Sequence, residues 1–219
     1  MSSTRSTTAT ALRASFALAL ALAGLAAAPS ARADGEVAAA RATMQQTVDT
    51  TLAVLNDKSL APDVRRSKLE SIAVDHFDFP LMAQLVLGKN RAALSTEQQQ
   101  QFLDEFKKHV SITYGRTFNK YTGAEKIVLD GGRLEGNKDV TLRMNISGGS
   151  APPDGVRIDY RMRDDAGKWL VIDVIPEGVS LIQNFRSQVQ EMVTQKGVAN
   201  LIQTLHDKNV SQAQAQAPS

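Results

Sequence analysis

Few residues in this chain of 219 could do chemistry. It has three histidines, His76, His109 and His206, and none lies in the HExxH or HxH spacing that brings two imidazoles to one metal ion. Cysteine is absent, which excludes a disulfide framework, a thiolate nucleophile and a cysteine metal site. The sequence also has no GxSxG elbow, P-loop or dinucleotide glycine fingerprint. We therefore expect no metal, no cofactor and no catalytic set of these kinds.

One carboxylate stands out by its position. Asp173 lies within residues 169–176, where the seven other residues are apolar, and such a run is typical of a strand buried on both faces. A carboxylate there could be a general base whose pKa is raised by burial. It could instead accept hydrogen bonds from the following turn or pair with an arginine, and we favour this structural role because buried charges usually have partners. Ser180 and Gln183 then predict a capping box and a helix start.

The first 33 residues have the pattern of a secretory signal peptide. Arg5 and Arg13 give a positive n-region, and residues 16–28 form an apolar stretch too short to span a bilayer. Residues 31–33 read A-x-A, so we expect cleavage after Ala33. The product would be exported.

The composition of the remaining 186 residues excludes some partners. They carry 22 basic and 23 acidic side chains, a balance that gives no electrostatic case for nucleic acid. No later segment is long and apolar enough to cross a membrane. We expect a single α+β domain over residues 34–210 and a disordered tail over residues 211–219, whose Gln-Ala repeats are of low complexity.

Helices and strands are predicted in separate parts of the chain. Apolar residues at three- and four-residue spacing predict N-terminal and C-terminal helices. Four short runs with alternating side chains, separated by Gly- or Asp-rich turns, predict a four-stranded antiparallel meander with one apolar face. The predicted helices are 36–56, 62–74, 79–87, 95–123, 180–195 and 198–208, and the predicted strands are 125–134, 139–147, 155–163 and 168–175.

Two surfaces of these elements have open interpretations. The stripe from Phe102 to Tyr121 could line a ligand cavity, although its spacing is also that of a core helix packed on a sheet, which we favour. The arginine-rich face of the sheet could dock a partner or lipid head groups. A solvated face, on which Arg and Asp pair across strands, explains the same pattern, and we favour it as well.

Three blocks of sequence together resemble one known family. The first is FDF at 77–79 with MAQLVLG at 82–88, and the second is LSTEQQ at 94–99 followed by phenylalanines and Tyr114. The third is DV at 173–174, EGVSL at 177–181 and FRSQ at 185–188. In this order and spacing they resemble the MlaC family of periplasmic phospholipid-binding proteins, also called toluene-tolerance auxiliary proteins. A sister branch associated with hopanoid lipids shares the resemblance.

The resemblance implies a curved sheet and helices that enclose an apolar lipid pocket, with phospholipid as cargo and no cofactor. Members of the family carry phospholipid between an outer-membrane lipoprotein–porin complex and an inner-membrane ABC transporter. By resemblance this chain would be a periplasmic monomer doing the same, and not an enzyme. The residues expected to line the pocket are Phe79, Met82, Val86, Phe106, Val110, Tyr114, Met144, Ile158, Tyr160, Val171, Val174 and Val179.

Two other functions fit the same sequence. A small-molecule enzyme on an α+β fold would use Asp173 as its general base. A structural or chaperone-like exported protein would have a filled core and no ligand.

Overall fold

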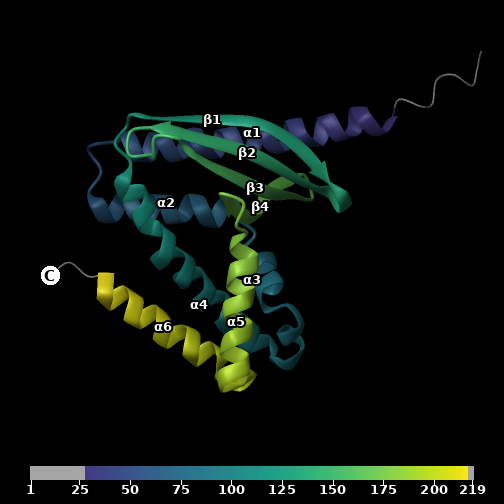
Figure 1. Ribbon diagram of the computed structural model, residues 1–219, viewed down its shortest axis with the longest axis vertical. Helices are drawn as coiled ribbons and strands as arrows, with labels where there is room; N and C mark the ends of the chain where they lie inside the picture. The colour runs from purple at the N-terminus through teal and green to yellow at the C-terminus, as the bar shows by residue number, and fades with distance from the viewer. Residues whose placement is uncertain (1–27, 217–219) are drawn as a thin grey trace, which may run out of the picture.

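Four strands in chain order form the antiparallel sheet around which the fold is built. The computed structural model describes residues 28–216, and in it the strands are β1 (Glu125–Glu135), β2 (Asp139–Gly148), β3 (Val156–Asp165) and β4 (Lys168–Pro176). Each strand lies within two residues of its predicted bounds. With helices before and after this curved sheet, the predicted α+β class is confirmed (Figure 1).

Side chains alternate across the sheet as predicted. Leu142 of β2 pairs with Tyr160 of β3 on the apolar face, and Thr141 pairs with Arg161 on the polar face. A register shift interrupts this alternation in β4, because Met162 and Tyr160 pair with residues that are three apart instead of two. Those residues are Val171 and Val174, so the bulge places both on the apolar face.

Helices precede and follow the sheet in the sequence. Asp78 accepts a hydrogen bond from the Leu81 N–H and caps one of them, and Ser95 and Gln98 form the capping box of another. The helices are α1 (Ala28–Asn56), α2 (Pro62–His76), α3 (Phe79–Leu87), α4 (Thr96–Tyr114), α5 (Leu181–Lys196) and α6 (Leu201–Gln216), with short 3-10 helices η1 (Gly88–Ala93), η2 (Gly115–Lys120), η3 (Gly136–Lys138) and η4 (Val198–Asn200).

Helix α1 covers much of the apolar face of the sheet. It runs alongside the strands in Figure 1, and the Arg41 guanidinium donates a hydrogen bond of 2.9 Å to the Leu129 carbonyl of β1. Apolar side chains of α1 and the strands bury each other there, which removes area from water that both elements would otherwise expose. We call this group the sheet core: Ala40, Met44, Val140, Leu142, Met144, Met162, Trp169 and Val171.

A second core lies among the other helices. The rings of Phe79 and Phe185 each meet the Phe106 ring edge to face, at centroid distances of 6.5 and 5.5 Å, a favoured aromatic geometry. Helices α4, α5 and α6 form a group below the sheet in Figure 1. The buried residues that these three helices share with α3 and with Leu94 are called the helical core: Phe79, Met82, Ala83, Val86, Leu87, Leu94, Phe102, Phe106, Leu181, Ile182, Phe185, Val189, Leu201 and Leu205.

The two cores meet beside β4. Phe77 and Val174 are half-buried and pack against both cores. Phe77 also forms an isolated bridge with Val171, and the Asp78 N–H donates to the Val171 carbonyl at 2.9 Å. This short extension covers the free edge of β4, which would otherwise expose unpaired backbone groups. We call the contact zone around Phe77 and Val174 the seam.

Several predicted helix bounds were wrong. Helix α4 ends at Tyr114 instead of residue 123, because Gly115 and the Thr-Phe-Asn sequence after it are poor helix formers. Helix α6 continues to Gln216 through most of the segment predicted to be disordered, since Gln and Ala favour helix. Helix α1 starts earlier than predicted, at Ala28.

The predicted signal peptide falls largely outside the part of the chain that the structure describes. Residues 1–27 and 217–219 are not described, so the cleavage prediction stays a prediction. Within residues 28–216, no helix combines the length and apolar character needed to cross a bilayer.

Candidate functional site

The apolar face of the sheet is covered unevenly. Val140 and Leu142 of β2 are 0% and 1% exposed. On the same face, Ile146 near the end of β2 and both Ile158 and Tyr160 of β3 are only half-buried, although Tyr160 pairs with the buried Leu142. An antiparallel sheet that buries one face normally covers it along its whole length. The half-covered stretch therefore marks apolar surface on which another apolar group could pack.

The structure sorts most of the predicted pocket residues into the two cores. Phe79, Met82, Val86 and Phe106 belong to the helical core, with Val110 and Tyr114 at its margin. Met144 and Val171 belong to the sheet core, with Tyr160 and Val174 at its margin, and Ile158 is half-buried on the same face. The two groups meet at the seam, where Val174 touches both cores. Most of the set therefore lies in or beside two packed cores that meet at the seam.

Val179 lies apart from this group. It is 59% exposed, in the turn between β4 and α5. The turn is closed by a 2.9 Å hydrogen bond from the Val179 N–H to the Pro176 carbonyl, with φ of +48° at Glu177 and +83° at Gly178. Gly178 has no Cβ and so permits this sharp turn, which leaves the Val179 side chain in solvent.

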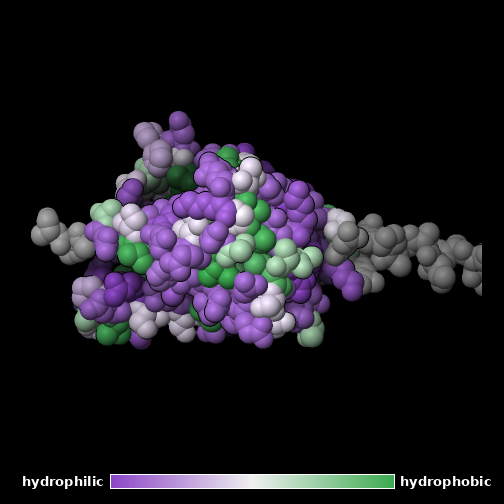
Figure 2. Space-filling view, turned by 90° about the horizontal axis from the view of Figure 1, so that it is seen from below, coloured by the Kyte–Doolittle hydropathy of each residue, from purple (hydrophilic) through white to green (hydrophobic). Residues whose placement is uncertain are grey.

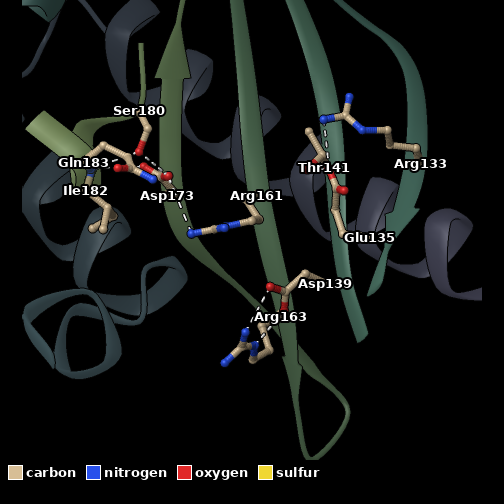
Figure 3. Close-up of polar contacts among 10 residues, drawn as sticks. All are labelled: Arg133, Glu135, Asp139, Thr141, Arg161, Arg163, Asp173, Ser180, Ile182 and Gln183. Carbon is tan, nitrogen blue, oxygen red and sulfur yellow. Dashed lines mark hydrogen bonds and ion pairs between the residues drawn. The ribbon is translucent and has the colours of Figure 1, made fainter. Parts of the chain in front are cut away.

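Asp173 holds that turn in place (Figure 3). Its carboxylate accepts hydrogen bonds from the Ser180 hydroxyl at 2.6 Å and from the Ile182 N–H at 3.1 Å. The Arg161 guanidinium lies 3.6 Å from the same carboxylate. Ser180 in turn accepts from the Gln183 N–H, although the reciprocal half of the predicted capping box is not formed. These contacts match the structural role favoured from the sequence, because both carboxylate oxygens are engaged.

Ion pairs join neighbouring strands on the polar face of the sheet. Arg143 forms two hydrogen bonds with Asp159, at 2.9 and 3.2 Å, and Arg163 forms two with Asp139, at 2.6 and 2.9 Å. The second pair is drawn in Figure 3. The cross-strand pairing favoured from the sequence is present, although Asp139 and Thr141 of this face are only 7% and 3% exposed. A hollow of about 190 Å³ lies beside the β1 bulge on this face, lined by Asp130, Gly131, Gly132, Arg133, Thr141 and Arg143.

A buried polar network between α4 and α6 was not predicted. Asn209 donates to the Glu105 carboxylate at 2.9 Å, and its amide oxygen lies 2.7 Å from His109 Nδ1. Since the Asn209 nitrogen is a donor, its oxygen must accept, so His109 carries its proton on Nδ1. The spacing of Phe102, Glu105, Phe106 and His109 at three and four residues could have revealed this network, because it places polar groups on the buried helix face.

Hydrogen bonding controls the ionisation of this network. Burial disfavours ionisation of Glu105, but hydrogen bonds from Lys108, Asn209 and His206 outweigh it and lower the pKa of the carboxyl to about 2. Burial lowers the pKa of His109, and its hydrogen bond with Asn209 only partly opposes this.

A hollow of about 400 Å³ lies beside the network, lined by Gln101, Asp104, Glu105, Lys108, Ile202, Gln203 and His206. Its lining is too polar to hold acyl chains.

The outer surface of the helical group is mixed. Leu85, Met192 and Val198 are half-buried at the margin of the helical core. Seen from below, this side of the molecule is mostly hydrophilic, with a hydrophobic patch near its centre and smaller hydrophobic areas elsewhere (Figure 2). Among residues 28–216, no three His, Asp or Glu side chains are grouped to hold a metal ion.

Comparison with known proteins agrees with this arrangement. The family model described as MlaC protein matches residues 45–207. The chain belongs to the MlaC family. A solved structure titled as a phospholipid-binding protein from Ralstonia solanacearum in complex with a phospholipid is 26% identical, with a TM-score of 0.69. The match covers 80% of this chain and 98% of that one, so the whole MlaC-type architecture is shared.

Two curated relatives match over shorter parts of this chain. The intermembrane phospholipid transport system binding protein MlaC of Haemophilus influenzae is 20% identical over 142 residues, 64% of this chain and 66% of that protein. The toluene tolerance protein ttg2D of Pseudomonas putida is 26% identical over 103 residues, 46% of each chain. The matched part thus spans less than two thirds of each relative.

Proposed function

We propose that this protein is a phospholipid carrier that holds the acyl chains of one lipid between its sheet and its helices. The observation that carries the proposal is the shared fold with a relative solved in complex with a phospholipid, over 98% of that relative's chain. The half-covered apolar stretch of the sheet, next to the seam, supplies a surface for the tails in this chain.

The physical demands of the task match what the chain offers. Moving an acyl chain into water costs about 0.8 kcal/mol per CH₂, so two tails of roughly 30 such groups together cost on the order of 20 kcal/mol. A carrier that touched only the head group could not offset this cost. It must cover the tails with apolar side chains and needs no catalytic group, and both cores here are built from such side chains.

Lipid would enter at the seam. The expected pocket residues fill the two cores, and Phe77 and Val174 touch both of them. Because these two side chains join otherwise separate cores, moving the helical group away from the sheet exposes apolar walls on both sides. The lipid tails then take the place of the contacts that the cores make with each other. Residues of the seam and of the Ile158–Tyr160 stretch would line the opening.

The family and the predicted signal peptide support a proposal for the cellular setting. We propose that the chain is exported to the periplasm as a monomer. Its partners there would be an inner-membrane ABC lipid transporter and an outer-membrane lipoprotein–porin complex. We do not assign catalysis to Asp173, because its carboxylate is committed to Ser180, Ile182 and Arg161.

Lipid extraction tests the proposal directly. Protein stripped of lipid is mixed with liposomes that contain a labelled phospholipid, separated from them and counted. We expect the wild type to remove lipid and Ile158→Asp to lose more than tenfold in uptake, since a carboxylate beside the tails pays a large desolvation cost. The matched control is Val128→Asp, because Val128 is 43% exposed and pairs with Asn145 on the polar face. A wild type that extracts no lipid would refute the carrier function.

A further inference from the structure

The three tyrosines of the chain differ in what their hydroxyl groups contact. The Tyr121 hydroxyl donates a hydrogen bond to the Asn56 side chain at 3.3 Å. Among residues 28–216, the hydroxyls of Tyr114 and Tyr160 have no hydrogen-bond partner. Within residues 28–216 neither hydroxyl oxygen is among the buried side-chain atoms that lack a partner, so both reach solvent. At the candidate site, such a hydroxyl is free to donate to a group of the ligand.

Tyr160 occupies a central place in that site. It lies on the apolar face of the sheet, in register with Leu142 on one side and Val174 on the other. Its side chain packs at the margin of the sheet core and is only half-buried. Burial raises the pKa of Tyr160 to about 12, so the phenol keeps its proton throughout the physiological range and can act as a hydrogen-bond donor.

The surroundings of Tyr160 restrict which acceptor can reach it. Its register partners and the half-buried Ile158 offer only apolar side chains on this face. A phosphate would be poorly stabilised there, because an ionised group near apolar walls needs a counter-charge. A neutral carbonyl oxygen, which accepts hydrogen bonds and donates none, suits a lone neutral donor. In a diacyl lipid such carbonyls sit where the tails join the glycerol.

We propose that the Tyr160 hydroxyl donates a hydrogen bond to an acyl ester carbonyl of the bound lipid and so selects ester-linked lipids. This inference rests on the proposed carrier function and adds a chemical class of ligand to it. Tyr160 then fixes how deep the glycerol sits, with the tails against the apolar stretch and the head group toward solvent. Ether-linked lipids, and polycyclic lipids without acyl esters, lack this acceptor and lose the contact.

Paired lipids test the inference. Affinities are measured for a diacyl phosphatidylethanolamine and for its dialkyl ether analogue with the same head group and chain lengths. We expect the wild type to prefer the ester lipid by about three- to tenfold, the usual effect of one net hydrogen bond. Tyr160→Phe should bind both lipids alike. Tyr121→Phe removes a hydroxyl that already has a protein partner, and it should keep the wild-type preference.

The possible results separate this inference from the proposed function. If the wild type binds both lipids and Tyr160→Phe keeps the same ester preference, Tyr160 is not the selecting donor, although the protein remains a carrier. If the wild type binds neither lipid, both ideas fail. A second measurement needs no variant. Infrared spectra of a carbonyl-¹³C lipid bound to the wild type should show one ester band shifted to lower frequency, and two unshifted bands would overturn the inference.

Discussion

Removing the Asp173 carboxylate tests whether it braces the turn or performs catalysis. In Asp173→Ala the Ser180 hydroxyl and the Ile182 N–H lose their acceptor, at 2.6 and 3.1 Å, and Arg161 loses its ion pair. These three groups come from the turn, from α5 and from β3. The substitution therefore loosens the connection between the sheet and the C-terminal helices.

The size of the effect follows from the geometry. Asp173 is 2% exposed, and each hydrogen bond to a buried charge contributes about 1.5–3 kcal/mol. The Arg161 pair is long, and its guanidinium side is 33% exposed, so it adds little. Ser180 can still cap α5 through its bond with the Gln183 N–H. We expect Asp173→Ala to lower the free energy of unfolding by about 3–4 kcal/mol, and Asp173→Asn, which keeps one acceptor, by about 1–2 kcal/mol.

Urea denaturation followed by circular dichroism measures these losses. The midpoint should shift to lower urea with an unchanged slope, because the same surface is exposed on unfolding. Asp63→Ala is the control, since Asp63 pairs with Arg66 where the side chains are 86% and 69% exposed, and it should cost less than about 1 kcal/mol. A catalytic base predicts the opposite pattern, because removing a strained active-site charge often stabilises a protein. If both Asp173 variants unfold within about 0.5 kcal/mol of the wild type, the bracing role is wrong.

Three other outcomes follow from the structure. Gly88→Ala should destabilise the fold by about 1–2 kcal/mol in thermal melting. The reason is that φ at Gly88 is +53° and the new Cβ would lie 2.9 Å from Arg186 Nη2. The control Gly115→Ala should not destabilise the fold, because Gly115 has a helical φ of −57°. The Glu105 carboxyl, with its pKa of about 2, stabilises the fold above its unfolded pKa near 4.5. About 2 kcal/mol should therefore be lost as the pH falls from about 4.5 toward 2, and Glu105→Gln should lack that part of the acid dependence. The pKa of His109 is lowered from 6.5, so stability should also fall as the pH drops below about 6.5, and unfolding measured at stepped pH should show a flatter profile in His109→Gln.

Local signals predicted the sheet and the caps well. Alternation in β2 and β3 fixed which face is apolar, and the turn residues fixed the ends of each strand. Ser180 caps the helix that its position predicted. These features depend on neighbours within a few residues, which a single sequence records.

The arrangement of the cores could not be predicted in the same way. The stripe through Phe102 and Phe106 shows that α4 buries one face, but its partners Phe185 and Leu201 come from distant helices. Most of the predicted pocket residues are apolar side chains grouped in or around the two cores, whereas Val179 is exposed in the turn after β4. Tertiary contacts also decide that Phe77 joins the two cores.

The most direct test of the carrier function is native mass spectrometry of the protein purified, without detergent, from cells that make it. If the protein is a phospholipid carrier, the spectrum should show a complex heavier than the polypeptide by the mass of one phospholipid. Fragmentation of the released ligand should give two fatty acyl chains and a phosphate-containing head group. A spectrum of the bare polypeptide alone, or a bound molecule without acyl chains, would show that the protein is not a phospholipid carrier.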